Sequence, residues 1–161
     1  MIGNNAFYEC VSLRSITFPE GLTTIGKDAF HGCSGLQSLR FPESLTSLGK
    51  EAFFNCSLSS VDIPQGVTTI PRGAFNSCRK LTVVTIRGNI TGVDYCAFQL
   101  CINLKYIYCY AESVPYLDSE AMHNCNQSID LYVRKDLNYQ QWEDTYPNFI
   151  TFTVSMSAFK S

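Results

Sequence analysis

The stretch IGKDAFHGCSGLQSLRFPESLTS, residues 25–47, decides the fold, because the chain repeats it with small changes. Its first marker is an Ala-Phe pair, Ala29-Phe30, followed three residues later by Cys33. The cysteine returns at successive spacings of 23, 23, 22, 23 and 24 residues, at Cys10, Cys33, Cys56, Cys78, Cys101 and Cys125. Self-similarity at such a period predicts a repeat architecture.

Each copy of the repeat also contains a short segment in which apolar residues alternate with others, which is typical of a β-strand. The alternating apolar pairs are Ile16/Phe18, Leu39/Phe41, Val61/Ile63, Val84/Ile86, Ile107/Cys109 and Leu131/Val133. A single 23-residue turn cannot bury its own apolar face, so the turns must stack on one another. The sequence therefore predicts a solenoid whose six short strands form a parallel sheet.

The repeated unit resembles that of BspA-like leucine-rich-repeat proteins, found mostly in bacterial surface proteins and in some protists. Residues 2 to about 134 carry the resemblance. The segment LYVRKDLNYQQWEDTYPNFITFTV, Leu131–Val154, resembles the closing segment of that family. The resemblance implies an α/β repeat solenoid of the leucine-rich-repeat class, with irregular outer turns and a C-terminal α/β cap. We expect six repeats over residues 1–134 and the cap and tail over 135–161.

An open solenoid end exposes apolar side chains, so the last turn needs a cover. We expect Leu137, Trp142 and Tyr146 to lie over that turn, and Tyr139 and Gln140 to face outward. No comparable cap precedes Ile2, and no basic, apolar signal peptide opens the chain. Further repeats, or a signal peptide and a cap, are therefore expected before it. The oligomeric state stays open, and the N-terminal end is a candidate for pairing with another chain.

Composition excludes several classes of partner. The chain has 161 residues, of which 45% are hydrophobic and 16% charged, with a formal net charge of −2. Its twelve Lys and Arg residues are scattered, so no footprint for nucleic acid is expected. The longest charge-free stretch, Thr145–Phe159, is interrupted by Pro147, Asn148 and several hydroxyl residues, so no membrane span is expected.

The eight cysteines favour a buried column of free thiols over a set of disulfides. The six that recur in register should all point into the core, where free cysteine behaves as a small hydrophobe. Cys109 takes the core place of Phe18 and Phe41, so its burial is also expected. Cys96 shares the place of Asp28 and is expected near the surface, as a candidate reactive or intermolecular thiol.

No residue pattern points to catalysis, a metal or a cofactor. His31 and His123 hold the same place in repeats four turns apart, roughly 19 Å by strand spacing, and are expected to be surface or loop residues. The recurring acidic residues, among them Asp28 and Glu51, are expected to be solvated loop charges. Motifs for a nucleophile elbow, a zinc protease or a phosphate loop are absent from the sequence.

The outward, concave side of the strands holds the candidate ligand-binding residues. In each strand the residues beside the apolar pair point away from the core. Tyrosines and arginines, the types enriched in binding hot spots, gather there in the second half of the chain. The candidates are Tyr106, Tyr108, Tyr110, Tyr132, Arg87 and Arg134, and in the first half Arg40 and Asp62 in neighbouring turns. The alternative is that Tyr116 or the tail covers the tyrosine rings.

The resemblance implies a non-enzymatic, surface-exposed adhesion module, because similar proteins are associated with binding to host proteins or to other cells. The expected partner is then a protein ligand, such as a host extracellular-matrix or cell-surface protein, and the expected location is extracellular or on the cell surface. The alternative is a structural spacer in a larger surface protein. An enzyme is the least favoured of the three.

Overall fold

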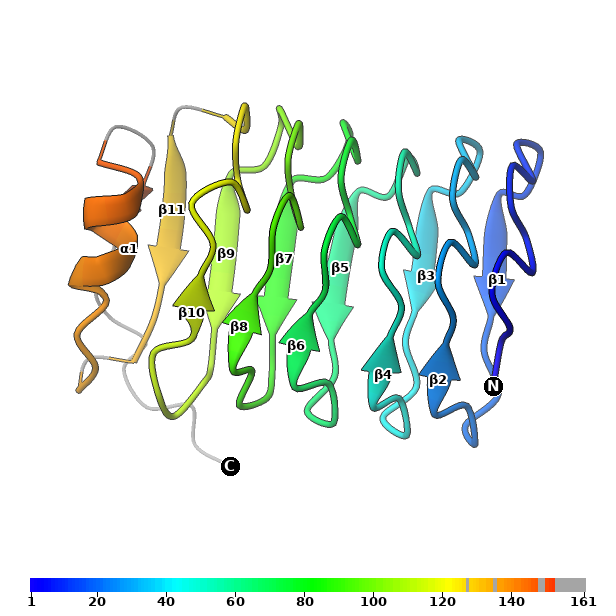
Figure 1. Ribbon diagram of the computed structural model, residues 1–161, viewed down its shortest axis with the longest axis horizontal. Helices are drawn as coiled ribbons and strands as arrows, with labels where there is room; N and C mark the ends of the chain where they lie inside the picture. Colours follow the sequence, from blue (N-terminus) through cyan, green and yellow to red (C-terminus); the bar gives the residue numbers. More distant parts are fainter. Residues whose placement is uncertain (127, 135, 148–149, 153–161) are drawn as a thin grey trace.

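Six short strands stand side by side along one wall of the chain, where the sequence predicts them (Figure 1). The computed structural model describes residues 1–126, 128–134, 136–147 and 150–152. The strands of this long row are β1 (Ser15–Thr17), β3 (Ser38–Arg40), β5 (Ser60–Ile63), β7 (Val83–Ile86), β9 (Tyr106–Cys109) and β11 (Ile129–Tyr132). Every backbone pairing between them is parallel, and equivalent repeat positions face each other. The predicted repeat solenoid is confirmed.

The outer turns are more regular than the sequence predicts, because they contain a second row of parallel strands. Its two-residue strands are β2 (Thr24–Ile25), β4 (Ser47–Leu48), β6 (Thr69–Ile70), β8 (Gly92–Val93) and β10 (Tyr116–Leu117). The second residue of each is apolar and buried in every case. Each turn thus places apolar side chains between two strand rows, which makes the solenoid two-walled.

The long row divides into two sheets where the repeat is one residue short. Strands β1 and β3 pair with each other, while β5, β7, β9, β11 and β12 (Ile150–Phe152) form a five-stranded sheet. The candidate tyrosines all belong to turns of this larger sheet.

An aromatic stack runs through the centre of the solenoid. The phenylalanines of successive Ala-Phe pairs lie face to face, with ring centroids 4.9–5.6 Å apart from Phe7 through Phe98. Phe30, Phe53 and Phe75 are fully buried. Because one stacked pair adds about 0.5–1.5 kcal/mol beyond its burial, the stack ties each turn to the next.

The recurring cysteines form a second column, with a role that the sequence does not reveal. Each thiol donates a hydrogen bond to a phenylalanine carbonyl of the preceding turn, at Sγ–O distances of 2.9–3.2 Å; the donors are Cys33, Cys56, Cys78, Cys101 and Cys125. Burial raises the pKa of the thiols of Cys33, Cys56, Cys78 and Cys101, that of Cys78 to about 12. All eight cysteines are free. Cys10, in the first turn, departs from the prediction because it is exposed.

Two residues in each of the first five turns adopt a left-handed backbone, and they flank the Ala-Phe pair. The first of these positions is occupied by Asn5, Asp28, Glu51, Gly73 and Cys96, at φ values of 55°, 53°, 56°, 63° and 55°. Left-handed backbone suits glycine and costs about 1–2 kcal/mol at other residues. Its recurrence in register shows that the stacking of turns dictates this backbone shape against local preference.

A helix and a strand close the C-terminal end, as predicted. Helix α1 (Gln140–Thr145) lies beyond β11, and β12 pairs with β11 (Figure 1). Trp142 is 1% exposed, and its indole Nε1 donates to the Pro115 carbonyl at 2.9 Å. Tyr146 is also buried, and its hydroxyl accepts a hydrogen bond from the Met122 amide at 2.9 Å. Within the described ranges, no helix is long and apolar enough to cross a membrane.

The prediction that Tyr139 faces outward is wrong, because Tyr139 is buried. Its hydroxyl lies 3.5 Å from the Cys109 sulfur and donates to it. Cys109 stands where earlier turns have Phe18 and Phe41, so its smaller side chain leaves room for a ring from the cap. Gln140 is exposed as expected, Leu137 is half-buried, and the tail Met156–Ser161 lies outside the described residues.

At the other end of the solenoid, Phe7 and Leu13 of the first turn are half-buried. Preceding segments and pairing of this end with another chain stay predictions, as does the boundary between repeats and cap at residue 134.

Candidate functional site

The outward side of β9 and β11 carries a pair of stacked tyrosines. Tyr108 and Tyr132 occupy facing positions in the parallel ladder, and their rings stack at 4.7 Å with an interplanar angle of 17°. The alternation of strand residues explains the pair, because Ile107, Cys109 and Leu131 point into the core and are buried. The tyrosines must therefore point outward.

Two further tyrosines extend this pair along β9. Tyr106 is 37% exposed and faces Val83 and Asp130 in the neighbouring strands. Tyr110 follows the end of β9 and is half-buried; burial raises the pKa of its phenol, while the charge of Arg87 opposes that shift. We call Tyr106, Tyr108, Tyr110 and Tyr132 together the tyrosine face.

Arg87 is held in place beside the tyrosine face. Its guanidinium binds the Asp62 carboxylate with two parallel hydrogen bonds, one of them 2.7 Å from Nε to Oδ1. This contact raises the pKa of Arg87. Asp62 also shares a small surface depression with Arg40 and Glu43. Arg40, Asp62 and Arg87 thus lie in successive turns of the long row, with Arg87 paired to Asp62.

Arg134 is positioned in the same way at the end of β11. It donates from Nε and Nη2 to the two carboxylate oxygens of Asp136, at 3.1 and 2.9 Å. The guanidinium lowers the pKa of Asp136. Arg87 and Arg134 are thus each paired with an aspartate, and neither pairing was predicted.

The described part of the cap covers the end of the solenoid, whereas Tyr106 of the tyrosine face is exposed. Trp142 and Tyr146 of the cap contact Pro115 and the loop 118–122, on the side of the second strand row. In Figure 1, α1 lies beyond the last turn and does not extend over the long row. Tyr106 accordingly keeps more than a third of its surface exposed.

A known family of repeat proteins matches most of the chain. The BspA type leucine rich repeat region matches residues 1–129, in six copies. The chain belongs to the BspA-type leucine-rich-repeat family. This BspA-type assignment agrees with the resemblance seen in the sequence and with six long-row strands. No curated protein matches the chain.

Solved structures agree with the BspA-type fold. A leucine rich cell surface protein from Faecalibacterium prausnitzii is 26% identical, with a TM-score of 0.67 over 86% of this chain and 35% of its own. The pneumococcal vaccine antigen PcpA is 20% identical, with a TM-score of 0.72 over 100% of this chain and 40% of its own. A leucine rich repeat protein from T. pallidum is 21% identical, with a TM-score of 0.65 over 98% of this chain and 79% of its own.

This BspA-type chain therefore spans 35% and 40% of the first two of these proteins. It is a repeat module of a kind found in cell-surface proteins. None of the three descriptions names an enzyme.

Cys96 does not lie where the sequence predicts it. It is 6% exposed instead of near the surface, and burial raises the pKa of its thiol. A buried thiol with a raised pKa is poorly reactive, so Cys96 loses its place as the candidate reactive cysteine.

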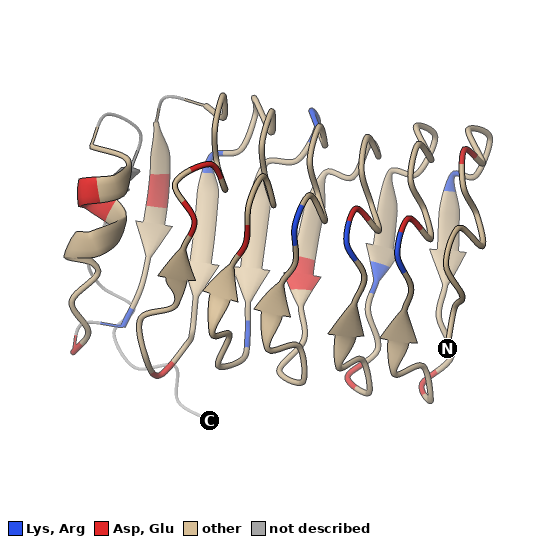
Figure 2. Cartoon of the chain, in the orientation of Figure 1, with Lys and Arg blue, Asp and Glu red and all other residues tan. Residues whose placement is uncertain are grey.

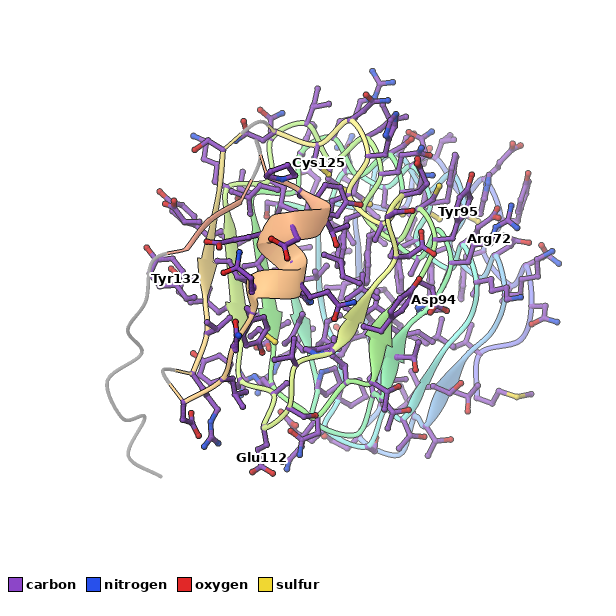
Figure 3. The ribbon with its side chains drawn as sticks, turned by 60° about the vertical axis from the view of Figure 1, so that its left-hand side comes forward. Arg72, Asp94, Tyr95, Glu112, Cys125 and Tyr132 are labelled. Carbon is purple, nitrogen blue, oxygen red and sulfur yellow. The ribbon has the colours of Figure 1, made fainter. Side chains whose placement is uncertain are left out.

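A second group of polar residues lies on a different side of the solenoid, and the sequence does not reveal it. Asp28 was expected to be a solvated loop charge but is buried at 9% exposure. It adjoins His31 and Glu51, and Glu51 lines a hollow of about 290 Å³ together with Arg72 and Tyr95. Figure 3 shows Arg72 and Tyr95 on the opposite side of the body from Tyr132. The sequence feature that could have predicted this group is the spacing of 23 residues, which brings Asp28 beside Glu51.

Proposed function

We propose that this BspA-type module binds a protein ligand at a cell surface through the tyrosine face, without catalysing a reaction. The observation that supports this most strongly is the stacked pair Tyr108–Tyr132 on the outside of a sheet. Tyrosine supplies a large rigid contact area with a polar hydroxyl at its tip, and it is enriched in the hot spots of protein interfaces.

The charges around the tyrosine face favour a protein over a nucleic acid. Arg87 and Arg134 are each paired with an aspartate, so their positive charges are largely balanced. Nucleic-acid binding needs unpaired cations that follow the phosphate backbone. Figure 2 shows acidic and basic segments scattered along the described part of the chain, consistent with a net charge of −2. A mixed rim around an aromatic centre is the usual anatomy of a protein interface.

The expected partner is a host extracellular-matrix or cell-surface protein, and the expected location is the cell surface. The structural neighbour with 26% identity is described as a cell surface protein, which supports this location.

A spacer function is the second candidate, and the first half of the chain favours it. The outward positions there are small and polar, with Ser15, Ser38 and Ser60 in register or at equivalent places. Such a surface offers little contact area for a partner. In this case the turns would hold another domain at a distance, and the tyrosines would contribute to packing alone.

Replacing Tyr108 and Tyr132 together by Ser is expected to weaken binding of the protein ligand by about 30-fold or more, the size of one interface hot spot. The measurement is capture from a panel of immobilised extracellular-matrix and cell-surface proteins, followed by titration of each protein that the wild type binds. Far-UV circular dichroism checks that the double variant keeps its fold.

Tyr116→Ser is the matched control, because Tyr116 is 55% exposed but lies in the second strand row. It should bind as the wild type does. Unchanged affinity in the folded double variant would exclude the tyrosine face as the binding surface. Failure of the wild type to bind any protein of the panel would favour the spacer.

A further inference from the structure

Three metal-ligating side chains meet on two neighbouring turns, away from the tyrosine face. One ligand atom from each of Asp28, His31 and Glu51 lies within 4.8 Å of the other two. Asp28 and Glu51 occupy equivalent repeat positions and share the same left-handed backbone, with φ values of 53° and 56°. The stacking of turns, more than local preference, therefore brings the two carboxylates together.

Two of the polar atoms in this cluster are buried without a partner. Asp28 Oδ1 and His31 Nδ1 form no hydrogen bond, although both are shielded from solvent, and Asp28 as a residue is 9% exposed. An unsatisfied buried polar group costs about 1–3 kcal/mol, and more when it is charged. A carboxylate oxygen and an imidazole nitrogen in this state are both electron-pair donors, so a bound cation satisfies both at once.

The imidazole of His31 is fixed in orientation by its neighbours. It stacks between Tyr8, at 4.8 Å and 10°, and Phe54, at 4.5 Å and 8°. The stack holds the plane of the ring and leaves the nitrogens at its edge. Metal sites depend on such restraint of their ligands.

Each carboxylate in the cluster has one oxygen near a cation and a second oxygen available. Lys27 Nζ lies 3.2 Å from Asp28 Oδ2, and Arg72 Nε lies 3.9 Å from Glu51 Oε1. Figure 2 shows basic and acidic segments adjoining in the loops that follow β2 and β4. Lys27 and Arg72 are more than half exposed, so these ion pairs are weak, and the two cations can turn toward solvent when a metal binds.

We propose that Asp28, His31 and Glu51 bind a zinc-type divalent transition-metal cation, which links the second turn to the third. The imidazole selects against magnesium and calcium, which prefer oxygen ligands alone, and favours zinc and its neighbours. Zinc–ligand distances near 2.1 Å place tetrahedral ligands about 3.4 Å apart, so the ligand atoms, now within 4.8 Å of one another, need to close by up to about 1.4 Å. Three protein ligands leave a fourth position for water.

Titration of the Cys10→Ser protein with Zn²⁺ alone tests the site, since this background removes the exposed thiol as a competing ligand. We expect one zinc ion per chain by calorimetry, together with a rise in the melting temperature, because the ion joins two turns. His31→Phe keeps the aromatic stack with Tyr8 and Phe54 but removes the nitrogens. It is expected to weaken zinc binding by about tenfold or more.

Glu51→Gln provides a second variant, should His31→Phe fail to fold, and is expected to lose affinity to the same degree. His123→Phe is the matched control: His123 is exposed, and its Nδ1 lies 3.4 Å from Glu120 Oε2 outside the cluster. Zinc binding should be unchanged in that variant. The site is overturned if the Cys10→Ser protein shows no saturable binding up to about 1 mM Zn²⁺, or if folded His31→Phe and Glu51→Gln bind as tightly as their parent.

Discussion

Replacing Phe53 by Ala is expected to lower the free energy of unfolding by about 3–5 kcal/mol, the usual range for removing a buried phenylalanine. Phe53 is fully buried and stacks on Phe30 at 5.1 Å and on Phe75 at 5.6 Å. Its loss leaves a cavity in the middle of the stack and weakens two interfaces between turns. In a repeat protein each turn depends on its neighbours, so a central defect affects both halves.

Phe54→Ala is the matched control for this prediction. Phe54 is half-buried, and its ring stacks on His31 at 4.5 Å outside the central stack. Its replacement is expected to cost about 1 kcal/mol, the contribution of one aromatic pair. Urea unfolding followed by far-UV circular dichroism measures both variants. Equal losses for Phe53→Ala and Phe54→Ala would show that the central stack does not hold the turns together.

Replacing Trp142 by Ala is expected to lower the free energy of unfolding by about 3–5 kcal/mol. The loss arises at the C-terminal end of the solenoid. Trp142 is buried, its indole donates to the Pro115 carbonyl at 2.9 Å, and it meets Tyr139 edge-to-face at 5.5 Å. The variant loses both contacts and uncovers the last turns. Hydrogen exchange should therefore show reduced protection in β9 and β11 before β3 and β5, since a solenoid loses structure from an exposed end.

Gln141→Ala is the control that tests whether the loss of stability in Trp142→Ala is caused by removal of the indole. Gln141 is the exposed neighbour of Trp142 on α1, and its replacement should change the free energy of unfolding by less than about 0.5 kcal/mol. If Trp142→Ala left the protection of β9 and β11 unchanged, α1 would not be the cap of the solenoid.

Much of the fold follows from periodicity alone. A repeat of about 23 residues, with Phe30 and Cys33 as markers, predicts that equivalent residues lie in columns along the solenoid. The structure shows such columns for the phenylalanines and the cysteines. The second strand row was missed because strands as short as Thr24–Ile25 contain too few residues to show alternation. The inward turn of Tyr139 depends on the space left by Cys109, thirty residues earlier, and local patterning does not report such space.

The candidate sites were predictable to different degrees. Alternation along β9 places Tyr106 and Tyr108 on one side, and repeat register places Tyr132 beside them. The Arg87–Asp62 ion pair joins residues 25 positions apart, slightly more than one repeat. Repeat register pairs residues at equivalent positions and therefore does not predict this contact. The burial of Asp28 and of Cys96 does not follow from repeat register, because Asn5 and Glu51 at equivalent positions are exposed and half-buried.

The reactivity of the eight thiols in the folded protein tests the stacked-turn account most directly. Alkylation with iodoacetamide near pH 8, mapped by mass spectrometry, measures each cysteine separately. Cys10 is exposed and should react first, while the other seven cysteines are buried and should react only after unfolding in urea. Labelling of Cys56 and Cys78 in the folded protein as fast as Cys10 would contradict an interior built from stacked repeats.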